Sequence, residues 1–230
     1  RSMSLQRLVG HNIWKFDLPY LIRSSVYNRV KIPPYLLPFG GKFQRFENYS
    51  IDTMNLIGAG EWGYLLKLET ASMACGMSYG KTGSGKNFYR MPRKVQEEYL
   101  RQDLLMTEYL YNNIAESFGY EYEPIIFDIE TCPKTEGQIE MIAPKFDPEN
   151  VATGNLKDPE KIQAKIDNAE TNHIRSLQDK AGLHAHYSQP CAIGYIAKGK
   201  VELDFNEPKE LLTRFWSIVS EVWGNNHEQL

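Results

Sequence analysis

Apolar residues return at helical spacing in several parts of the chain and form short uninterrupted runs in others. The longest helical pattern covers 94–114, which contains neither glycine nor proline and carries its apolar residues largely on one side. Helices are also predicted at 16–26, at 65–75, from Asp158-Pro159 onward and from Pro208 onward. Strands are predicted at 5–12, 49–52 and 125–127, and as a hairpin of 191–197 and 201–205 around Lys198-Gly199-Lys200.

This mixture of strands and helices predicts an α/β fold. With 230 residues, 42% of them hydrophobic, the chain is long enough for one well-buried domain, so we expect a single domain over 1–230. The polar segment 145–182 is interpreted as an insertion that runs over the surface of that domain. The formal net charge of −3 gives no overall basic character, so any binding of phosphate must be local or must use bound cations.

The cysteines and the apolar runs suggest a compartment. Cys75, Cys132 and Cys191 lie far apart without C-x-x-C spacing, which argues against a zinc cluster and a disulfide framework. No apolar run approaches the roughly 18 to 20 residues that span a bilayer. We therefore expect a soluble protein of a reducing, intracellular compartment, without a membrane partner.

The strongest local motif is Ile125-Ile126-Phe127-Asp128-Ile129-Glu130. Alternate side chains of a strand share a face, so Asp128 and Glu130 point the same way after an apolar strand and can offer oxygen ligands to divalent cations. The alternative is a strand end that enters solvent, where two acids need no partner. The apolar residues before the pair, and acidic motifs elsewhere in the chain, favour a metal site.

Two further motifs carry acids. Asp17 follows Val9-Gly10-His11-Asn12 and begins a predicted helix, where the positive helix terminus stabilises a carboxylate; a simple helix cap is the alternative. Tyr99 and Asp103 are four residues apart on the long predicted helix, so both side chains can reach the same small volume.

Together these motifs resemble those of the DEDD superfamily of 3′ to 5′ exonucleases. Tyr99 places the resemblance with the DEDDy subgroup, and the chain is similar to the proofreading exonuclease domain of family B DNA polymerases. The segments Gly10-His11-Asn12, Phe16-Asp17-Leu18-Pro19 and Ile51-Asp52-Thr53-Met54 extend the resemblance beyond the acids. It implies a ribonuclease H-like mixed sheet of about five strands flanked by helices.

The motifs occur in an unusual order. In the family the D-x-E strand comes first, whereas Asp128 and Glu130 here follow the other two motifs. Joining Leu230 to Arg1 restores the family's succession, so the chain is interpreted as circularly permuted. A Cα separation of these two residues near 3.8 Å would indicate a peptide bond between them.

The resemblance implies a two-metal mechanism with Mg²⁺ or Mn²⁺. Asp128 would bridge the two cations, Glu130 and Asp103 would hold them further, and Asp17 would contribute directly or through water. Tyr99 would orient the attacking water, because a phenol with a pKa near 10 stays protonated at neutral pH.

The implied substrate is single-stranded DNA or a DNA 3′ end, with RNA not excluded, and the implied partners are replication or repair proteins. Candidate substrate-binding residues are His11, Asn12, Trp14, Lys81 and Lys86. Trp14 could stack on a base, and Lys81 and Lys86, with Arg90, Arg93 and Lys94 beyond them, could hold the phosphate backbone. His11 and Asn12 could equally form a hydrogen-bonded pair at the strand end.

Two other functions remain open. Gly80 to Asn87 nearly spells a phosphate-binding P-loop, but Asn87 stands where Ser or Thr is required and no apolar strand precedes the segment. A ribonuclease H-like scaffold that binds nucleic acid without cutting it is the second alternative.

Overall fold

The structure is a computed structural model that describes residues 7–36, 49–59, 65–81, 85–120, 123–179, 181 and 186–227. Within these ranges the side chains of Tyr35, Lys86, Asn87 and 222–227 are not described. The chain divides into two compact units: the first comprises Arg1–Glu130 with Pro190–Leu230, and the second comprises Thr131–Gln189. Arg1 and Leu230, whose separation bears on the permutation, lie outside the described residues.

The first unit is built on a five-stranded mixed sheet in the order β2-β1-β3-β4-β5. β1 runs parallel to both β2 and β3, and β4 runs antiparallel to β5. The predicted mixed α/β architecture is therefore confirmed. The strands are β1 (Arg7–Gly10), β2 (Ser50–Asp52), β3 (Pro124–Pro133), β4 (Ser188–Ala197) and β5 (Lys200–Asp204).

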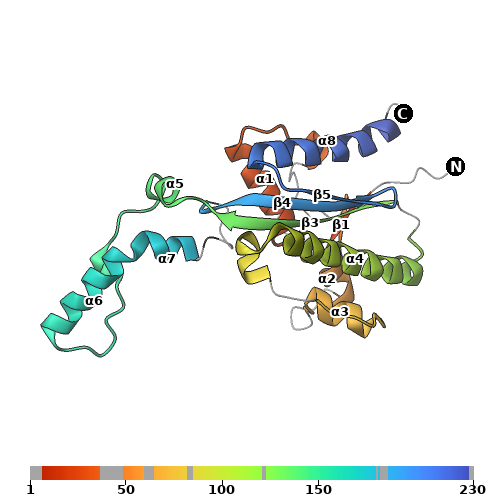
Figure 1. Ribbon diagram of the computed structural model, residues 1–230. Coiled ribbons are helices and arrows are strands. Elements are labelled where there is room, and N and C mark those ends of the chain that lie inside the picture. The colour runs from red at the N-terminus through yellow and green to blue at the C-terminus, as the bar shows by residue number, and fades with distance from the viewer. Residues whose placement is uncertain are drawn as a thin grey trace. The chain divides into compact units, whose positions relative to one another are not determined.

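Helices cover both faces of this sheet (Figure 1). One face carries α1 (Asp17–Tyr27) and α8 (Pro208–His227), and the other carries α2 (Thr53–Ile57), α3 (Leu68–Ala74) and α4 (Arg93–Phe118). Short 3-10 helices occur at η1 (Pro34–Leu36) and η2 (Gly85–Arg90).

The alternation of buried side chains along the strands explains these layers. On β3, Phe127 packs against Phe215 of α8 with ring centroids 5.2 Å apart, whereas Ile126 joins the cluster that includes Leu104 of α4. Gly194 lets α4 approach β4 closely, because a Cβ at this position would lie 2.8 Å from Leu104 Cδ1 and 2.9 Å from Leu100 Cγ. The helix that carries Tyr99 and Asp103 is thereby held tightly on the sheet.

The predicted elements occur with shifted ends. The long predicted helix extends to Arg93–Phe118, and the hairpin turns at Lys198-Gly199. β3 continues to Pro133, so Asp128 and Glu130 lie within a strand rather than at its end. The apolar run marked only the part of this strand that is buried on both faces. α2 was not predicted, although Asp52 marks its N-cap by accepting hydrogen bonds from the amides of Met54 and Asn55.

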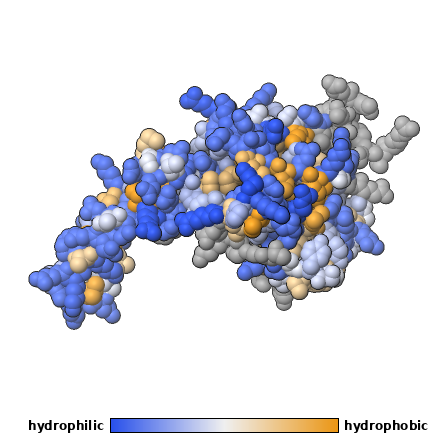
Figure 2. Space-filling view, viewed as in Figure 1, coloured by the Kyte–Doolittle hydropathy of each residue, from blue (hydrophilic) through white to orange (hydrophobic). Residues whose placement is uncertain are grey.

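The second unit contains the polar segment 145–182 and is largely helical. α6 (Pro159–Thr171) starts where Asp158-Pro159 predicts, and none of its residues is buried. α5 (Glu136–Glu140) was not predicted, although Thr135 and Gln138 form a capping box that the sequence displays. The remaining elements are η3 (Pro148–Asn150) and α7 (His173–Asp179), and the visible surface of the unit is mainly hydrophilic (Figure 2).

The described helices are too polar or too short to cross a bilayer.

Candidate metal centre

Three carboxylates from two elements of the first unit converge on one point. Asp128 and Glu130 project from β3 and Asp103 from α4, and each offers an oxygen within 4.8 Å of the others. Asp103 is buried, with 4% of its surface exposed, and the other two are partly buried. The central position of β3 under α4 brings together acids that lie far apart in sequence. Carboxylate oxygens in such a group are the ligands that hard divalent cations prefer.

Lys81 lies inside this cluster. Its Nζ is 2.7 Å from both carboxylate oxygens of Asp103 and donates a hydrogen bond to the Tyr99 hydroxyl at 3.2 Å. The backbone amide of Lys81 donates to Glu69 Oε1 of α3 at 3.0 Å, which fixes the start of the Lys81 side chain. The sequence suggested Lys81 only as a contact to the phosphate backbone, and no local motif pointed to Glu69.

Tyr99 lies one helical turn before Asp103 and is 8% exposed. The Phe88 ring of η2 packs edge-on against it, with centroids 5.9 Å apart. The backbone of Gly85 also approaches closely, because a Cβ there would lie 2.9 Å from the Tyr99 hydroxyl oxygen. η2 therefore forms a wall beside Tyr99 and holds its ring in place.

Asp17 contacts the same strand from the first turn of α1. It is 4% exposed, lies in the first turn of α1, and forms a hydrogen bond with the backbone of Ile129, between the two β3 acids. It is not a member of the three-carboxylate group found among the described residues. Its negative charge nevertheless acts on both Asp128 and Glu130.

The site carries an excess of negative charge. Burial, and then the charges of Asp103, Glu130 and Asp17, raise the pKa of Asp128 well above its usual range. Burial and the Asp103 charge raise the pKa of Glu130 to about 8, and burial, opposed in part by backbone hydrogen bonds, raises that of Asp17 to about 7. Burial also raises the pKa of Asp103, although Lys81 opposes the shift. Bound cations would relieve this repulsion.

The two groups beside the acids keep their protons. Burial, followed by the charge of Asp103, raises the pKa of Tyr99 to about 12, so the phenol is a hydrogen-bond donor at neutral pH. Burial lowers the pKa of Lys81, but the Asp103 carboxylate raises it by more, so the ammonium stays charged.

Both ring nitrogens of His11 are used within the protein. Nε2 lies 2.8 Å from the carbonyl oxygen of Leu66, and Nδ1 lies 2.9 Å from the Thr53 hydroxyl. Burial lowers the pKa of His11, which favours a neutral ring with Nε2 donating to the carbonyl of Leu66. The Thr53 hydroxyl, which lies against Nδ1, also donates to the carbonyl of Gly10 at 3.2 Å. These contacts join the end of β1 to Thr53 of α2 and to Leu66. They favour a structural role for His11, as a hydrogen-bonded residue at the end of a strand, over contact with a substrate.

Asp52 organises the turn that leads from β1 to Asp17. Its carboxylate accepts hydrogen bonds from the amides of Asn12 at 2.9 Å and Trp14 at 3.1 Å, in addition to capping α2. Asn12 has a left-handed backbone with φ of 66°. The Trp14 indole N–H donates to the Ser50 hydroxyl at 2.8 Å, so its ring is held by the protein although it is partly exposed. The side chain of Lys86 lies outside the described part of the chain.

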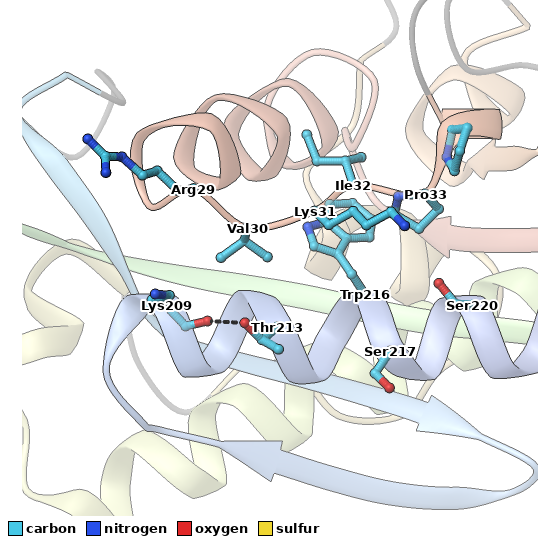
Figure 3. Close-up of a pocket in the computed structure, with 11 residues that line it drawn as sticks. Arg29, Val30, Lys31, Ile32, Pro33, Lys209, Thr213, Trp216, Ser217 and Ser220 are labelled. Atoms are coloured by element: carbon cyan, nitrogen blue, oxygen red, sulfur yellow. Dashed lines mark hydrogen bonds between the residues drawn. The ribbon is translucent and has the colours of Figure 1, made fainter.

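A separate cavity of about 460 Å³ lies between the segment that follows α1 and the helix α8 (Figure 3). Its lining includes Arg29, Lys31 and Lys209 together with apolar residues and hydroxyls. Trp216, which also lines it, is 2% exposed and donates its indole N–H to Ser25. None of the carboxylates described above borders this cavity.

Comparisons of the chain with protein-family models, with curated proteins and with solved structures found no match.

Proposed function

We propose that the protein is a metal-dependent 3′ to 5′ exonuclease of the DEDDy type that removes nucleotides from single-stranded DNA ends. The observation that carries this proposal is the convergence of Asp103, Asp128 and Glu130 within 4.8 Å, with Tyr99 and Lys81 bonded to the same group. Tyr99 supplies a protonated hydroxyl and Lys81 a positive charge next to these acids. A phosphodiester hydrolase uses all of these groups.

The residues fit two divalent cations. Asp128, Glu130 and Asp103 would supply oxygen ligands, and the charge of Asp17 acts on Asp128 and Glu130. Burial and then the repulsion between these acids raise their pKa values, and bound cations would relieve the repulsion. When bound, a pair of Mg²⁺ or Mn²⁺ ions would activate water and neutralise the charge on the phosphate and the leaving oxygen.

The neighbouring side chains would position the reactants. Tyr99 would donate its phenolic proton in a hydrogen bond and so orient the attacking water. Lys81 would place a fixed positive charge beside the scissile phosphate, at the atoms where negative charge increases. The water oxygen bonds to phosphorus, the bond from phosphorus to the 3′ oxygen breaks, and that oxygen takes a proton. The product is a nucleoside 5′-monophosphate.

The proposal includes a ribonuclease H-like fold with a circularly permuted chain order. Starting at β3, the elements run β3, β4, β5, α8, and then β1, α1, β2 and α4. In this order the D-x-E strand comes first, Asp17 follows, and the Tyr99 and Asp103 helix comes last, which is the succession that the resemblance requires. The D-x-E strand then lies at the centre of the sheet.

Two alternatives have less support. A P-loop needs Ser or Thr after its lysine and an apolar strand before its first glycine, and this chain has Asn87 after Lys86 and no such strand. A nucleic-acid-binding module without activity would keep the surface but not need the acids. Preference for DNA over RNA, and partners in replication or repair, rest on the resemblance alone.

The test is release of label from single-stranded DNA labelled at its 3′ end, in Mn²⁺, by the wild type and by Asp128→Asn. We expect activity in the wild type and a loss of at least a hundredfold in the variant. Glu97→Gln removes one charge from an exposed position of α4 and serves as the matched control. Equal activity of Asp128→Asn and the wild type would refute the site, and no activity in any protein would favour the binding module.

A further inference from the structure

Arginine side chains stacked on aromatic rings form an exposed surface on the first unit. The Arg90 guanidinium lies 5.2 Å from the centroid of the Tyr89 ring, and that of Arg93 lies 3.8 Å from the centroid of Phe205. Both arginines are exposed, and Tyr89 is 37% exposed. Neither guanidinium is paired with a carboxylate among the residues that the structure describes. We refer to Tyr89, Arg90, Arg93 and Phe205 as the basic rim.

The basic rim adjoins the metal centre through a chain of ring contacts. The buried Phe88 packs against Tyr99 of the centre at 5.9 Å and against Phe205 of the rim at 6.4 Å, with the Phe88 and Phe205 planes nearly parallel. Gln96 of α4 donates a hydrogen bond to the carbonyl of Phe88 at 2.8 Å, which fixes η2 on the helix. Cys191, which packs in the same cluster, contacts the carbonyl of Glu130. The rim and the acids therefore lie at the same end of the sheet.

We propose that the basic rim binds the part of a single-stranded nucleic acid that lies on the 5′ side of the scissile phosphodiester. This assignment rests on the proposed nuclease function and adds a second binding site to it. A guanidinium that stacks on a ring keeps its N–H groups at the edge, where they can bind phosphate oxygens. The exposed Tyr89 ring offers a face on which a base can stack, with no demand on its identity.

The geometry also sets how much of the strand the rim can reach. Arg93 precedes Tyr99 by six helical positions, which is about 9 Å along the axis of α4. At a stacked rise of 3.4 Å, this distance corresponds to about three nucleotides. Glu97 and Glu98 are exposed on the next turn of α4, so negative charge follows directly after the arginine and lysine of the first turn. The rim therefore serves substrates of at least four nucleotides and adds nothing for a mononucleotide ester.

The experiment compares two substrates in Mn²⁺. The first is an oligothymidylate of eight nucleotides, and the second is the p-nitrophenyl ester of thymidine 5′-monophosphate, which has no nucleotide on the 5′ side of the scissile bond. The test variant is Arg90→Ala/Arg93→Ala. The control is Lys198→Asn/Lys200→Ala, which removes two charges at the far end of β4, about 23 Å along the strand from Cys191. Asparagine suits the left-handed backbone of Lys198, whose φ is 50°.

We expect the test variant to lose roughly tenfold to a hundredfold in kcat/KM on the oligonucleotide and to stay within about twofold of the wild type on the ester. In a series of two to twelve nucleotides, kcat/KM of the wild type should rise to about four nucleotides and then level off. The test variant should show little rise. The control should match the wild type on both substrates.

Salt gives an independent readout. Two lost phosphate contacts should reduce the slope of log kcat/KM against log salt concentration by about 1.4 for a single strand, and the control should keep the wild-type slope. An equal loss on both substrates, or no loss on the oligonucleotide, would overturn the assignment of the rim while leaving the nuclease in place. A wild type that cleaves neither substrate would instead contradict the proposed function, and the rim assignment with it.

Discussion

Replacing Asp128 by asparagine should stabilise the protein in the absence of metal and reduce the stabilisation that metal provides. In the absence of metal, Asp128 lies among the like charges of Glu130 and Asp103, with Lys81 as the neighbouring cation. Removing its charge relieves this repulsion, so Asp128→Asn should be more stable than the wild type in EDTA. Mn²⁺ should stabilise the wild type more than the variant, because the variant has lost one of the proposed metal ligands.

The size of the first effect follows from the geometry. Two full charges at the 4.8 Å limit of the cluster repel by about 3.5 kcal/mol at an effective dielectric constant near 20. Protonation already relieves part of this repulsion, so we expect a gain of about 1 to 3 kcal/mol, or roughly 5 °C in Tm for a chain of this length. Mn²⁺ at a hundred times its Kd should add about 2.7 kcal/mol to the wild type, or roughly 5 to 10 °C.

The assay is thermal unfolding of the wild type, Asp128→Asn and Glu97→Gln, each in EDTA and in a titration of Mn²⁺. Glu97→Gln should follow the wild type within about 0.5 kcal/mol under both conditions, because it removes an exposed surface charge. Two results would refute the reasoning: an Asp128→Asn variant less stable than the wild type in EDTA, or Mn²⁺ shifts of equal size in both proteins.

Three further substitutions test other parts of the structure. Lys81→Met should destabilise the protein by about 1 to 3 kcal/mol in EDTA, because Asp103 loses its partner. The same variant should gain more stability from Mn²⁺ than the wild type does. Tm values equal to those of the wild type in EDTA and in Mn²⁺ would count against the pairing of Lys81 with Asp103. His11→Asn should cost about 1 to 3 kcal/mol at pH 7.5, measured by urea unfolding. Burial lowers the pKa of His11 in the folded state, so as the pH falls below about 6.5 the imidazole is protonated in the unfolded wild type before it is protonated in the folded one. This protonation lowers the free energy of unfolding of the wild type, so the gap in stability between wild type and variant should narrow by pH 5.5. A gap that stays constant would contradict the lowered pKa. Gly194→Ala should cost about 1 to 3 kcal/mol by forcing Leu100 and Leu104 away from β4, whereas Gly137→Ala, with nothing within 4 Å, should be neutral; equal Tm values for both variants would show that α4 can yield.

Much of the fold is readable from the sequence because local patterns and tertiary packing agree. The apolar run before Asp128 predicts a central strand, and the spacing of Tyr99 and Asp103 predicts one helical face; both occur in the structure. The hairpin around Lys198-Gly199 follows from its turn residues. The extent of β3 could not be read in the same way, since its second half is only partly buried and lacks the apolar signal.

The partners of the acids depend on contacts across long stretches of chain. Lys81 reaches Asp103 because Glu69 accepts a hydrogen bond from its backbone amide. Neither the contact with Asp103 nor the contact with Glu69 corresponds to a local sequence motif. The two bonds of His11 join it to Thr53 and Leu66, far along the chain, so a histidine beside a predicted metal site could not be told from a substrate contact by sequence. The hydrogen bonds that Asp52 accepts from the amides of Asn12 and Trp14 also join distant parts of the chain, so the sequence did not predict them.

The most direct test of the central claim is the ladder of products from single-stranded DNA labelled at its 5′ end. With Mn²⁺ the wild type should shorten the strand one nucleotide at a time from the 3′ end and release nucleoside 5′-monophosphates, and EDTA should stop the reaction. Asp128→Asn should leave the strand intact under the same conditions. An intact strand with the wild type and Mn²⁺, or an identical ladder from the variant, would contradict the assignment of Asp103, Asp128 and Glu130 as a catalytic metal centre.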